Sequence, residues 1–259
     1  MGEVALITGA SSGIGAAMAE IHAALGGDLV IIARSGDKLN ILKRKLEVSE
    51  NCKLHVIVKD LTQDNAAQEI YDEVQQEGIE VDYLINNAGF GGHGKFYERP
   101  WEDDLSMIQL NVIALTALTR KFLPDFVTRN SGRVLNVSST ASLMPGPLQA
   151  VYFATKAYVT SFSNAIAEEL SDTNVTVTAL LPGATDTGFA DTAGMSNSSL
   201  FDNTFSAREV AQTGYDAMLE GKLDIMAGVS FGQKLMMKTI PITPKKVLMK
   251  QIRKMQELK

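Results

Sequence analysis

The sequence has few of the residues and runs that mark several common classes of protein. Its single cysteine, Cys52, cannot form an internal disulfide, which suits a reducing cytosol. Its three histidines, His22, His55 and His93, fall on separate predicted elements, so we expect no metal site. No apolar run approaches the length of a membrane-spanning helix. The start, GEVALITG, leaves no room for a signal peptide before the first predicted strand. We therefore expect a cytoplasmic protein.

The sequence also lacks an excess of positive charge. Its 259 residues carry a formal net charge of −6, which argues against nucleic-acid binding by the chain as a whole. The contents of hydrophobic residues, 45%, and of charged residues, 21%, are ordinary for a globular protein. The length is sufficient for one large α/β domain with a substantial core.

Short apolar runs alternate with helical patterns along most of the chain, as in proteins with buried parallel strands. The strands are predicted at 4–7, 28–33, 54–58, 81–85, 134–137, 175–181 and 222–227. The helices are predicted at 16–25, 37–50, 62–77, 101–128, 152–169 and 208–220, the fourth interrupted or ended near Pro124. This order predicts one Rossmann-type domain at 1–228, a doubly wound parallel sheet of about seven strands with helices on both faces.

A glycine-rich turn, TGASSGIG, joins the first predicted strand to the first helix. Glycines allow a ligand to approach the backbone, and the helix N-terminus presents free N–H groups to an anion. The spacing departs from the common G-x-G-x-x-G dinucleotide pattern, but its position at the first strand-to-helix junction favours a phosphate site.

Arg34 follows the second predicted strand, and no carboxylate occurs until Asp37. In dinucleotide-binding folds an acid near this point binds the ribose 2′-hydroxyl of NAD, whereas an arginine accommodates the 2′-phosphate of NADP. Arg34 therefore favours NADP(H), although it could also be a solvated loop charge.

Residues 133–156 contain the side chains most suited to catalysis. Tyr152 and Lys156 are four residues apart on one helix, so they lie on the same face. A neighbouring ammonium would lower the pKa of the phenol and allow it to exchange a proton near neutral pH. Ser139, at the end of the preceding strand, would hold the reacting oxygen. Such a pair is also common on solvated helix surfaces, so further evidence is needed.

Two other segments are candidates for the same site. NNAG at 86–89 follows the fourth predicted strand, where doubly wound sheets bind ligands. Asn111 lies within an apolar helical run and is either a satisfied core amide or a site residue. The polar stretch at about 184–207 lacks strong periodicity and is predicted to be a substrate loop.

Together these segments resemble the short-chain dehydrogenase/reductase family. The resemblance covers about residues 3–228, and the Ser-to-Tyr spacing selects Ser139 rather than Ser138. Its motifs occur in the family's order: TGASSGIG at 8–15, NNAG at 86–89, Asn111, Ser139, YFATK at 152–156 and PGATDT at 182–187. The helix with YFATK is similar to the branch of 3-oxoacyl reductases and related carbonyl reductases, whose members differ widely in substrate.

The resemblance implies hydride transfer between NADP(H) and a small-molecule ketone, 3-oxoacyl carbonyl or secondary alcohol. Tyr152 would be the general acid/base and Ser139 would hold the substrate oxygen. Lys156 would lower the Tyr152 pKa and bind the nicotinamide ribose, and Asn111 would anchor a water that links Lys156 to solvent. Family members are commonly dimers or tetramers, so we expect a homo-oligomer.

The resemblance also implies the cofactor contacts. Asp60 and Leu61 would contact adenine, 87–89 the ribose region and 183–187 the carboxamide. The complete predicted cofactor set is Gly9, Ser11, Ser12, Gly13, Ile14, Gly15, Arg34, Asp60, Leu61, Asn87, Ala88, Gly89, Tyr152, Lys156, Pro182, Gly183 and Thr187.

The last segment, 229–259, lies beyond these motifs and differs from the rest in charge. Eight basic residues and one acid give it a formal charge of +7, which leaves −13 for residues 1–228. Apolar residues alternate with the cations, and Pro241 and Pro244 divide the segment into two predicted short helices. Such helices could lie on an anionic membrane. We favour packing on the acidic body or on a second subunit. An NADP(H)-binding redox sensor or membrane-surface protein with little turnover is the alternative function.

Overall fold

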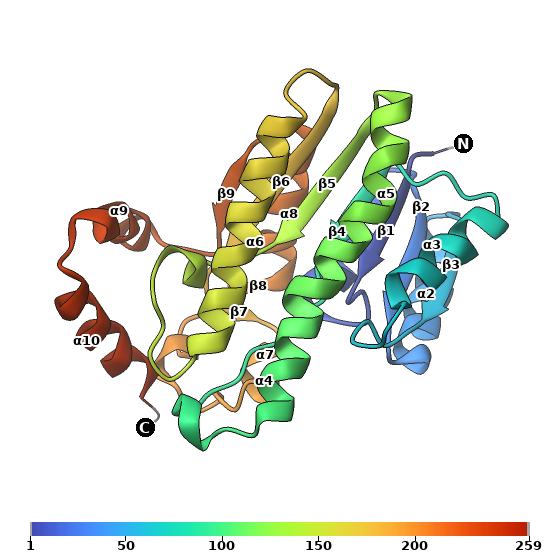
Figure 1. The fold of residues 1–259 in the computed structure, drawn as a ribbon. Helices are drawn as coiled ribbons and strands as arrows, with labels where there is room; N and C mark the ends of the chain where they lie inside the picture. Colours follow the sequence, from blue (N-terminus) through green and yellow to red (C-terminus); the bar gives the residue numbers. More distant parts are fainter. Residues whose placement is uncertain (1, 258–259) are drawn as a thin grey trace.

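Seven parallel strands form one sheet in the order β3-β2-β1-β4-β5-β6-β9 (Figure 1). This arrangement is that of a computed structural model, which describes residues 2–257, with the side chains of Ser199 and Pro241 left aside. The strands are β1 (Val4–Thr8), β2 (Asp28–Ala33), β3 (Leu54–Val58), β4 (Tyr83–Asn86), β5 (Gly132–Val137), β6 (Val175–Pro182) and β9 (Asp224–Ala227). The predicted Rossmann-type sheet is confirmed, and β2 and β3 have the predicted bounds.

Strands β1 and β2 are almost entirely apolar because both of their faces are buried. In β1, Ala5 and Ile7 belong to one core layer and Leu6 to the other, as the two-residue period of a strand requires. Helices α1 (Gly13–Ala24), α2 (Gly36–Ser49) and α8 (Ala207–Leu219) cover the first layer. Helices α3 (Ala66–Gln76), α5 (Leu115–Arg129) and α6 (Ala150–Glu169) cover the second (Figure 1).

The fourth predicted helix differs from expectation at two places. Its interruption is not at Pro124, which lies inside α5, but at the π-helical segment η2 (Gln109–Ala114) between α4 (Trp101–Ile108) and α5. Pro124 is on the exposed side of α5, where water can satisfy the carbonyl that it leaves unpaired. Phe122 and Phe126, on either side of it, are fully buried, and their packing maintains the helix.

The predicted substrate loop contains four short elements. They are β7 (Thr185–Asp186), α7 (Phe189–Thr192), η4 (Ser199–Phe201) and β8 (Phe205–Ser206). Because β7 pairs with β8, the two ends of the loop are joined beside the carboxyl edge of the main sheet. Two short 3-10 segments, η1 (Phe96–Glu98) and η3 (Thr140–Leu143), precede α4 and α6.

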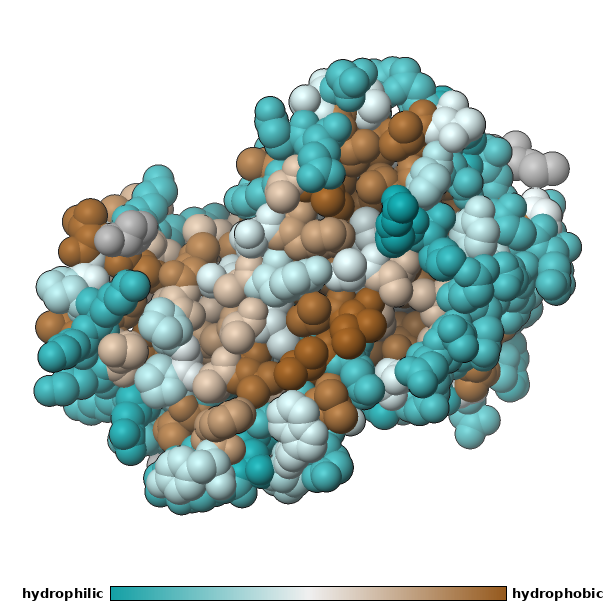
Figure 2. Space-filling model, viewed as in Figure 1, coloured by the Kyte–Doolittle hydropathy of each residue, from teal (hydrophilic) through white to brown (hydrophobic). Residues whose placement is uncertain are grey.

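The basic C-terminal segment forms α9 (Phe231–Thr239), η5 (Ile240–Ile242) and α10 (Lys245–Gln256), so it does contain two short helices. Of its basic residues, Lys259 lies outside the described residues. Hydrophobic and hydrophilic side chains are intermixed over this lobe, at the left of Figure 2, and Phe231 and Ile242 are each 84% exposed. Within residues 2–257, no helix combines the length and the apolar character needed to cross a membrane.

Candidate active site

A cavity of about 890 Å³ lies at the carboxyl edge of the sheet, where β1, β2, β3, β4, β5 and β6 end. The predicted cofactor residues come from five separate strand-to-helix junctions and from α6, and all of them except Gly15 line this cavity. Ser139, Tyr152 and Lys156 line it as well, whereas Asn111 does not. The fold thus brings the predicted phosphate, ribose and catalytic residues to one place.

The glycine-rich turn has the geometry of a phosphate cradle. Gly9 and Gly13 have positive φ angles of 67° and 56°, which glycine adopts without strain. A Cβ on Gly15 would lie 2.4 Å from Nδ2 of Asn87 and 2.5 Å from the oxygen of Gly9, so a larger residue does not fit. Gly15 therefore supports the turn from behind while its neighbours face the cavity. The residues present fit a bound dinucleotide.

Three basic residues line the end of the cavity that follows β2 and β3. The hydrogen bond that the Thr62 backbone N–H donates to the Asp60 carboxylate lowers the pKa of Asp60, and the charge of the exposed Arg34 acts in the same direction. Lys38 of α2 and Lys59 after β3 line the same end. These two lysines were not predicted to line the site, because nothing in their local sequence indicates that α2 and the end of β3 converge on Arg34.

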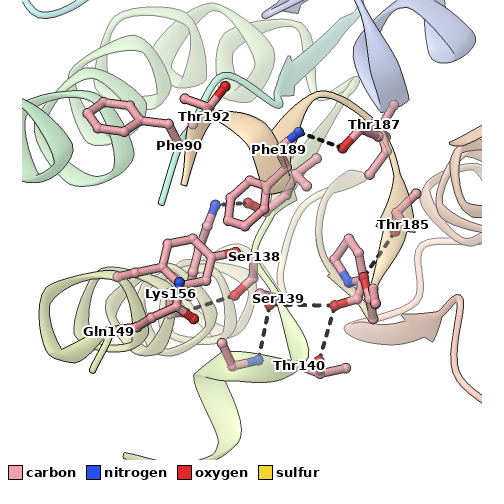
Figure 3. Close-up of a pocket in the computed structure, with 18 of the residues that line it drawn as sticks. Phe90, Ser138, Ser139, Thr140, Gln149, Lys156, Thr185, Thr187, Phe189 and Thr192 are labelled. Carbon is pink, nitrogen blue, oxygen red and sulfur yellow. Dashed lines mark hydrogen bonds between the residues drawn. The ribbon is translucent and has the colours of Figure 1, made fainter. Parts of the chain in front are cut away.

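Tyr152 and Ser139 meet beneath the substrate loop. Ser139 is the N-cap of η3, and its oxygen accepts a hydrogen bond of 3.1 Å from the Ala141 backbone. Ser138 instead donates to the Lys156 carbonyl at 2.9 Å and bonds Thr160 at 2.7 Å, so it fastens β5 to α6 (Figure 3). The structure therefore gives Ser139 and Ser138 different environments. The ring of Phe189 covers Tyr152, with 5.2 Å between ring centroids.

The expected effect of Lys156 on the pKa of Tyr152 is wrong for this structure. Burial raises the pKa of Tyr152 to about 12, although its hydrogen bond with Ser139 acts in the opposite direction. Burial also lowers the pKa of Lys156 to about 8. The lysine Nζ donates to the Val137 carbonyl at 2.8 Å and lies 5.9 Å from the Tyr152 ring centre. Desolvation thus favours the uncharged form of both side chains.

Asn111 lies in the π-helical segment η2 and is 1% exposed. Its Oδ1 accepts from the Phe90 backbone N–H at 3.1 Å, and its Nδ2 donates to the Phe90 carbonyl at 3.0 Å and to Thr155 Oγ1 at 3.1 Å. The amide therefore holds the loop after β4 against α6. A Cβ on Gly89 would lie 3.0 Å from Asn111 Oδ1 and 3.4 Å from Lys156 Nζ, so this loop passes directly over the lysine.

The substrate side of the cavity contains side chains that the sequence analysis did not assign to the site. Leu248 and Ile252 of α10 line the cavity and pack in one apolar cluster with Tyr152 and Phe153. In the sequence, only their spacing of four residues within the amphipathic C-terminal segment could have indicated that they share a buried face. His93, in the loop after β4, does not line the cavity and bonds the Gln256 carbonyl at 2.8 Å.

Comparisons with known proteins find a family match and similar structures. A family model described as short chain dehydrogenase matches residues 3–197. The chain is 36% identical to the very-long-chain 3-oxoacyl-CoA reductase of Mus musculus over 188 residues, which are 70% of this chain but 59% of that protein. It therefore spans less than two thirds of this relative's length.

Two solved structures are similar over most of the chain. A short-chain dehydrogenase from Sphingobium yanoikuyae, in complex with NADPH, is 29% identical with a TM-score of 0.84 and 98% coverage of both chains. A serine dehydrogenase complexed with NADP+ is 26% identical with a TM-score of 0.77, covering 86% of this chain and 93% of that one.

Proposed function

The chain belongs to the short chain dehydrogenase family, and from this membership we propose that it is an NADPH-dependent reductase of a ketone or 3-oxoacyl compound. The observation that supports this most is the convergence of the glycine-rich turn, Ser139, Tyr152 and Lys156 on one cavity. The oxidation of a secondary alcohol is the reverse of the same reaction.

The roles of the side chains follow from their environments. NADPH, when bound, supplies a hydride to the carbonyl carbon. Tyr152 donates its hydroxyl proton to the carbonyl oxygen, and a pKa raised to about 12 means that this proton is present at neutral pH. The Ser139 hydroxyl holds the same oxygen. Lys156, fixed by the Val137 carbonyl, is placed to bind hydroxyl groups and to return a proton to Tyr152. Asn111 supports this arrangement through the Phe90 loop.

The preference for NADPH is attributed to Arg34, with Lys38 and Lys59 beside it. A charge-assisted contact with the 2′-phosphate contributes roughly 1.5–3 kcal/mol, or about one to two decades in affinity. We expect the wild type to bind NADPH more tightly than NADH by that factor. Arg34→Ala should remove most of the difference by weakening NADPH binding alone.

The measurement is a fluorescence titration of both cofactors into wild type and Arg34→Ala. Arg44→Ala is the matched control, because Arg44 is exposed on α2 outside the cavity lining. Equal affinity of the wild type for the two cofactors would contradict the preference. A uniform loss for both cofactors in Arg34→Ala would mean that the arginine does not recognise the phosphate.

The reaction itself is tested by following nicotinamide absorbance with NADPH and a panel of ketones, 3-oxoacyl thioesters and secondary alcohols. The name of the mouse relative supports the 3-oxoacyl members of this panel. Tight NADPH binding with no turnover across the panel would favour the redox-sensing alternative. Activity that saturates with one substrate class would establish the reductase.

A further inference from the structure

The C-terminal segment forms part of the active-site wall, although it lies beyond the region 3–197 that the family model matches. On α10 the buried residues are Leu248, Ile252 and Gln256, spaced by four residues and therefore on one face of the helix. That face turns to the cavity, and its two apolar members belong to the cluster that contains Tyr152.

The end of α10 is attached to the loop that follows β4. His93 Nε2 bonds the Gln256 carbonyl at 2.8 Å. The His93 carbonyl in turn accepts from Arg99 Nη1 at 3.0 Å, and Arg99 Nε donates to the buried Asp104 carboxylate at 2.9 Å. A chain of hydrogen bonds therefore links α10 to α4, so the wall has a defined position over the site.

The charged and uncharged lining residues are segregated within the cavity. Among the lining residues that the structure describes, the charged ones other than Lys156 are Arg34, Lys38, Lys59 and Asp60, all at the end that follows β2 and β3. The rest of the described lining carries no charge other than Lys156 and is rich in methionine, a flexible side chain that adapts to irregular apolar ligands. A carboxylate or phosphate close to the reacting carbonyl would lose its hydration there with Lys156 as its single cationic partner.

Two of the polar side chains that line the cavity are buried amides. Gln149, at the start of α6, and Gln256, on α10, line the cavity and are 5% and 4% exposed (Figure 3 shows Gln149). Gln149 Nε2 and Gln256 Oε1 have no hydrogen-bond partner among the described residues. Buried amide groups without a partner are unfavourable, and an uncharged oxygen or hydroxyl group of a ligand could satisfy them.

We propose that α10 and the 184–207 loop enclose a chamber for an uncharged carbonyl compound with a long or bulky apolar group. Leu248 and Ile252 are its specificity-determining residues. This inference rests on the proposed reductase function, because it assigns the substrate class of the same site. It also explains why one face of α10 is buried against Tyr152.

The test compares Ile252→Phe, Ile252→Ala and wild type on methyl ketones of increasing chain length. In the wild type, kcat/KM should rise by about fourfold for each added methylene until the chamber is full, as transfer from water predicts. Ile252→Phe fills the chamber and should lower kcat/KM about tenfold for the longest ketones relative to the shortest. Ile252→Ala should shift the optimum to longer ketones. Val247→Phe is the matched control, since Val247 is 49% exposed and outside the lining.

Calorimetric binding of the same ketones to the NADPH-loaded protein separates this proposal from the proposed function. One outcome would be that no ketone is reduced, that ketone binding strengthens with chain length, and that Ile252→Phe removes this trend. This outcome would support the proposed chamber and contradict the reductase function. A chain-length trend that is identical in Ile252→Phe, Ile252→Ala and Val247→Phe overturns the proposal. Binding of short ketones that carry a carboxylate more tightly than uncharged long-chain ketones also overturns the proposal. Ile252→Ala adds no volume, so it decides the matter if Ile252→Phe does not fold.

Discussion

Two groups of buried tyrosines lie at opposite edges of the same sheet. At the amino edge, Tyr83 opens β4 and Tyr215 projects from α8, and both are at most 4% exposed. Tyr83 donates to a Glu3 carboxylate oxygen, and Tyr215 bonds His22 Nδ1 at 2.6 Å. His22 Nε2 lies 2.9 Å from the Glu3 carbonyl, to which it donates. At the carboxyl edge, Tyr152 is similarly buried, at 8% exposed.

The two groups differ in what surrounds the phenol, not in the direction of its pKa. Burial raises the pKa of Tyr83, Tyr215 and Tyr152 alike. The first two hydroxyls bond to protein groups outside the cavity lining, whereas Tyr152, which is hydrogen-bonded to Ser139, lines the large cavity beside Lys156. A perturbed pKa therefore does not identify a catalytic residue by itself. Access to a ligand and a second polar group directed at the same place are also needed.

The largest expected effect is on the carboxyl-edge tyrosine. Tyr152→Phe should lower kcat by at least about 100-fold, the usual loss for a removed general acid, because the phenyl ring cannot donate a proton. The free energy of unfolding should change by less than about 1 kcal/mol, because the ring and its packing remain. Steady-state kinetics and urea denaturation measure the two. Near wild-type turnover would exclude Tyr152 as the proton donor.

The amino-edge tyrosine should respond in the opposite way. Tyr215→Phe leaves the buried Nδ1 of His22 without its donor, which should lower the free energy of unfolding by about 1–3 kcal/mol. The value of kcat should stay within about twofold, since Tyr215 does not line the cavity. The same two assays apply, so each tyrosine variant is the control for the other. A large loss of turnover in Tyr215→Phe would remove the distinction between the two groups.

The smallest expected effect is a pH dependence of stability at the amino edge. Burial lowers the pKa of His22 below 6.5, so the unfolded chain binds this proton more strongly than the folded one. The stability contribution of the neutral ring is therefore complete above pH 6.5 and decreases as the pH falls below it. The slope is at most about 1.4 kcal/mol per pH unit for one proton. Urea midpoints of wild type and His22→Gln across this range measure it, and an unchanged slope in the variant would exclude His22 as the cause.

The basic segment 229–259 was predicted to pack on the body or on a second subunit, and the packing of α10 tests part of this prediction. Leu248 and Ile252 contact the chain's own active site, which agrees with the preference for packing on the body. Several other apolar side chains of α9 and α10, such as Phe231 and Leu235, are exposed. Contact of that outer surface with a second subunit or with a membrane remains a prediction, and so does the homo-oligomer.

Local rules were sufficient for much of the fold and for the identity of the candidate residues. A strand that is apolar on both faces, such as 28–33, is stable only when both faces are buried. The bounds of β2 could therefore be predicted from the sequence. The spacing of Tyr152 and Lys156 follows from the helical repeat. The turn after β1 needs glycine for its backbone angles. Arg34 could be assigned to the cofactor site because it comes directly after the predicted β2.

The tertiary structure decided what depends on segments that are distant in sequence. Desolvation set the pKa values of Tyr152 and Lys156, and it depends on what covers them, including Phe189 of the substrate loop. Packing on either side of Pro124 preserved a helix that local propensity would interrupt. The approach of α10 to the site required burial that no periodicity specifies. Backbone geometry and hydrophobic period are properties of neighbouring residues, whereas burial and convergence are properties of the whole fold.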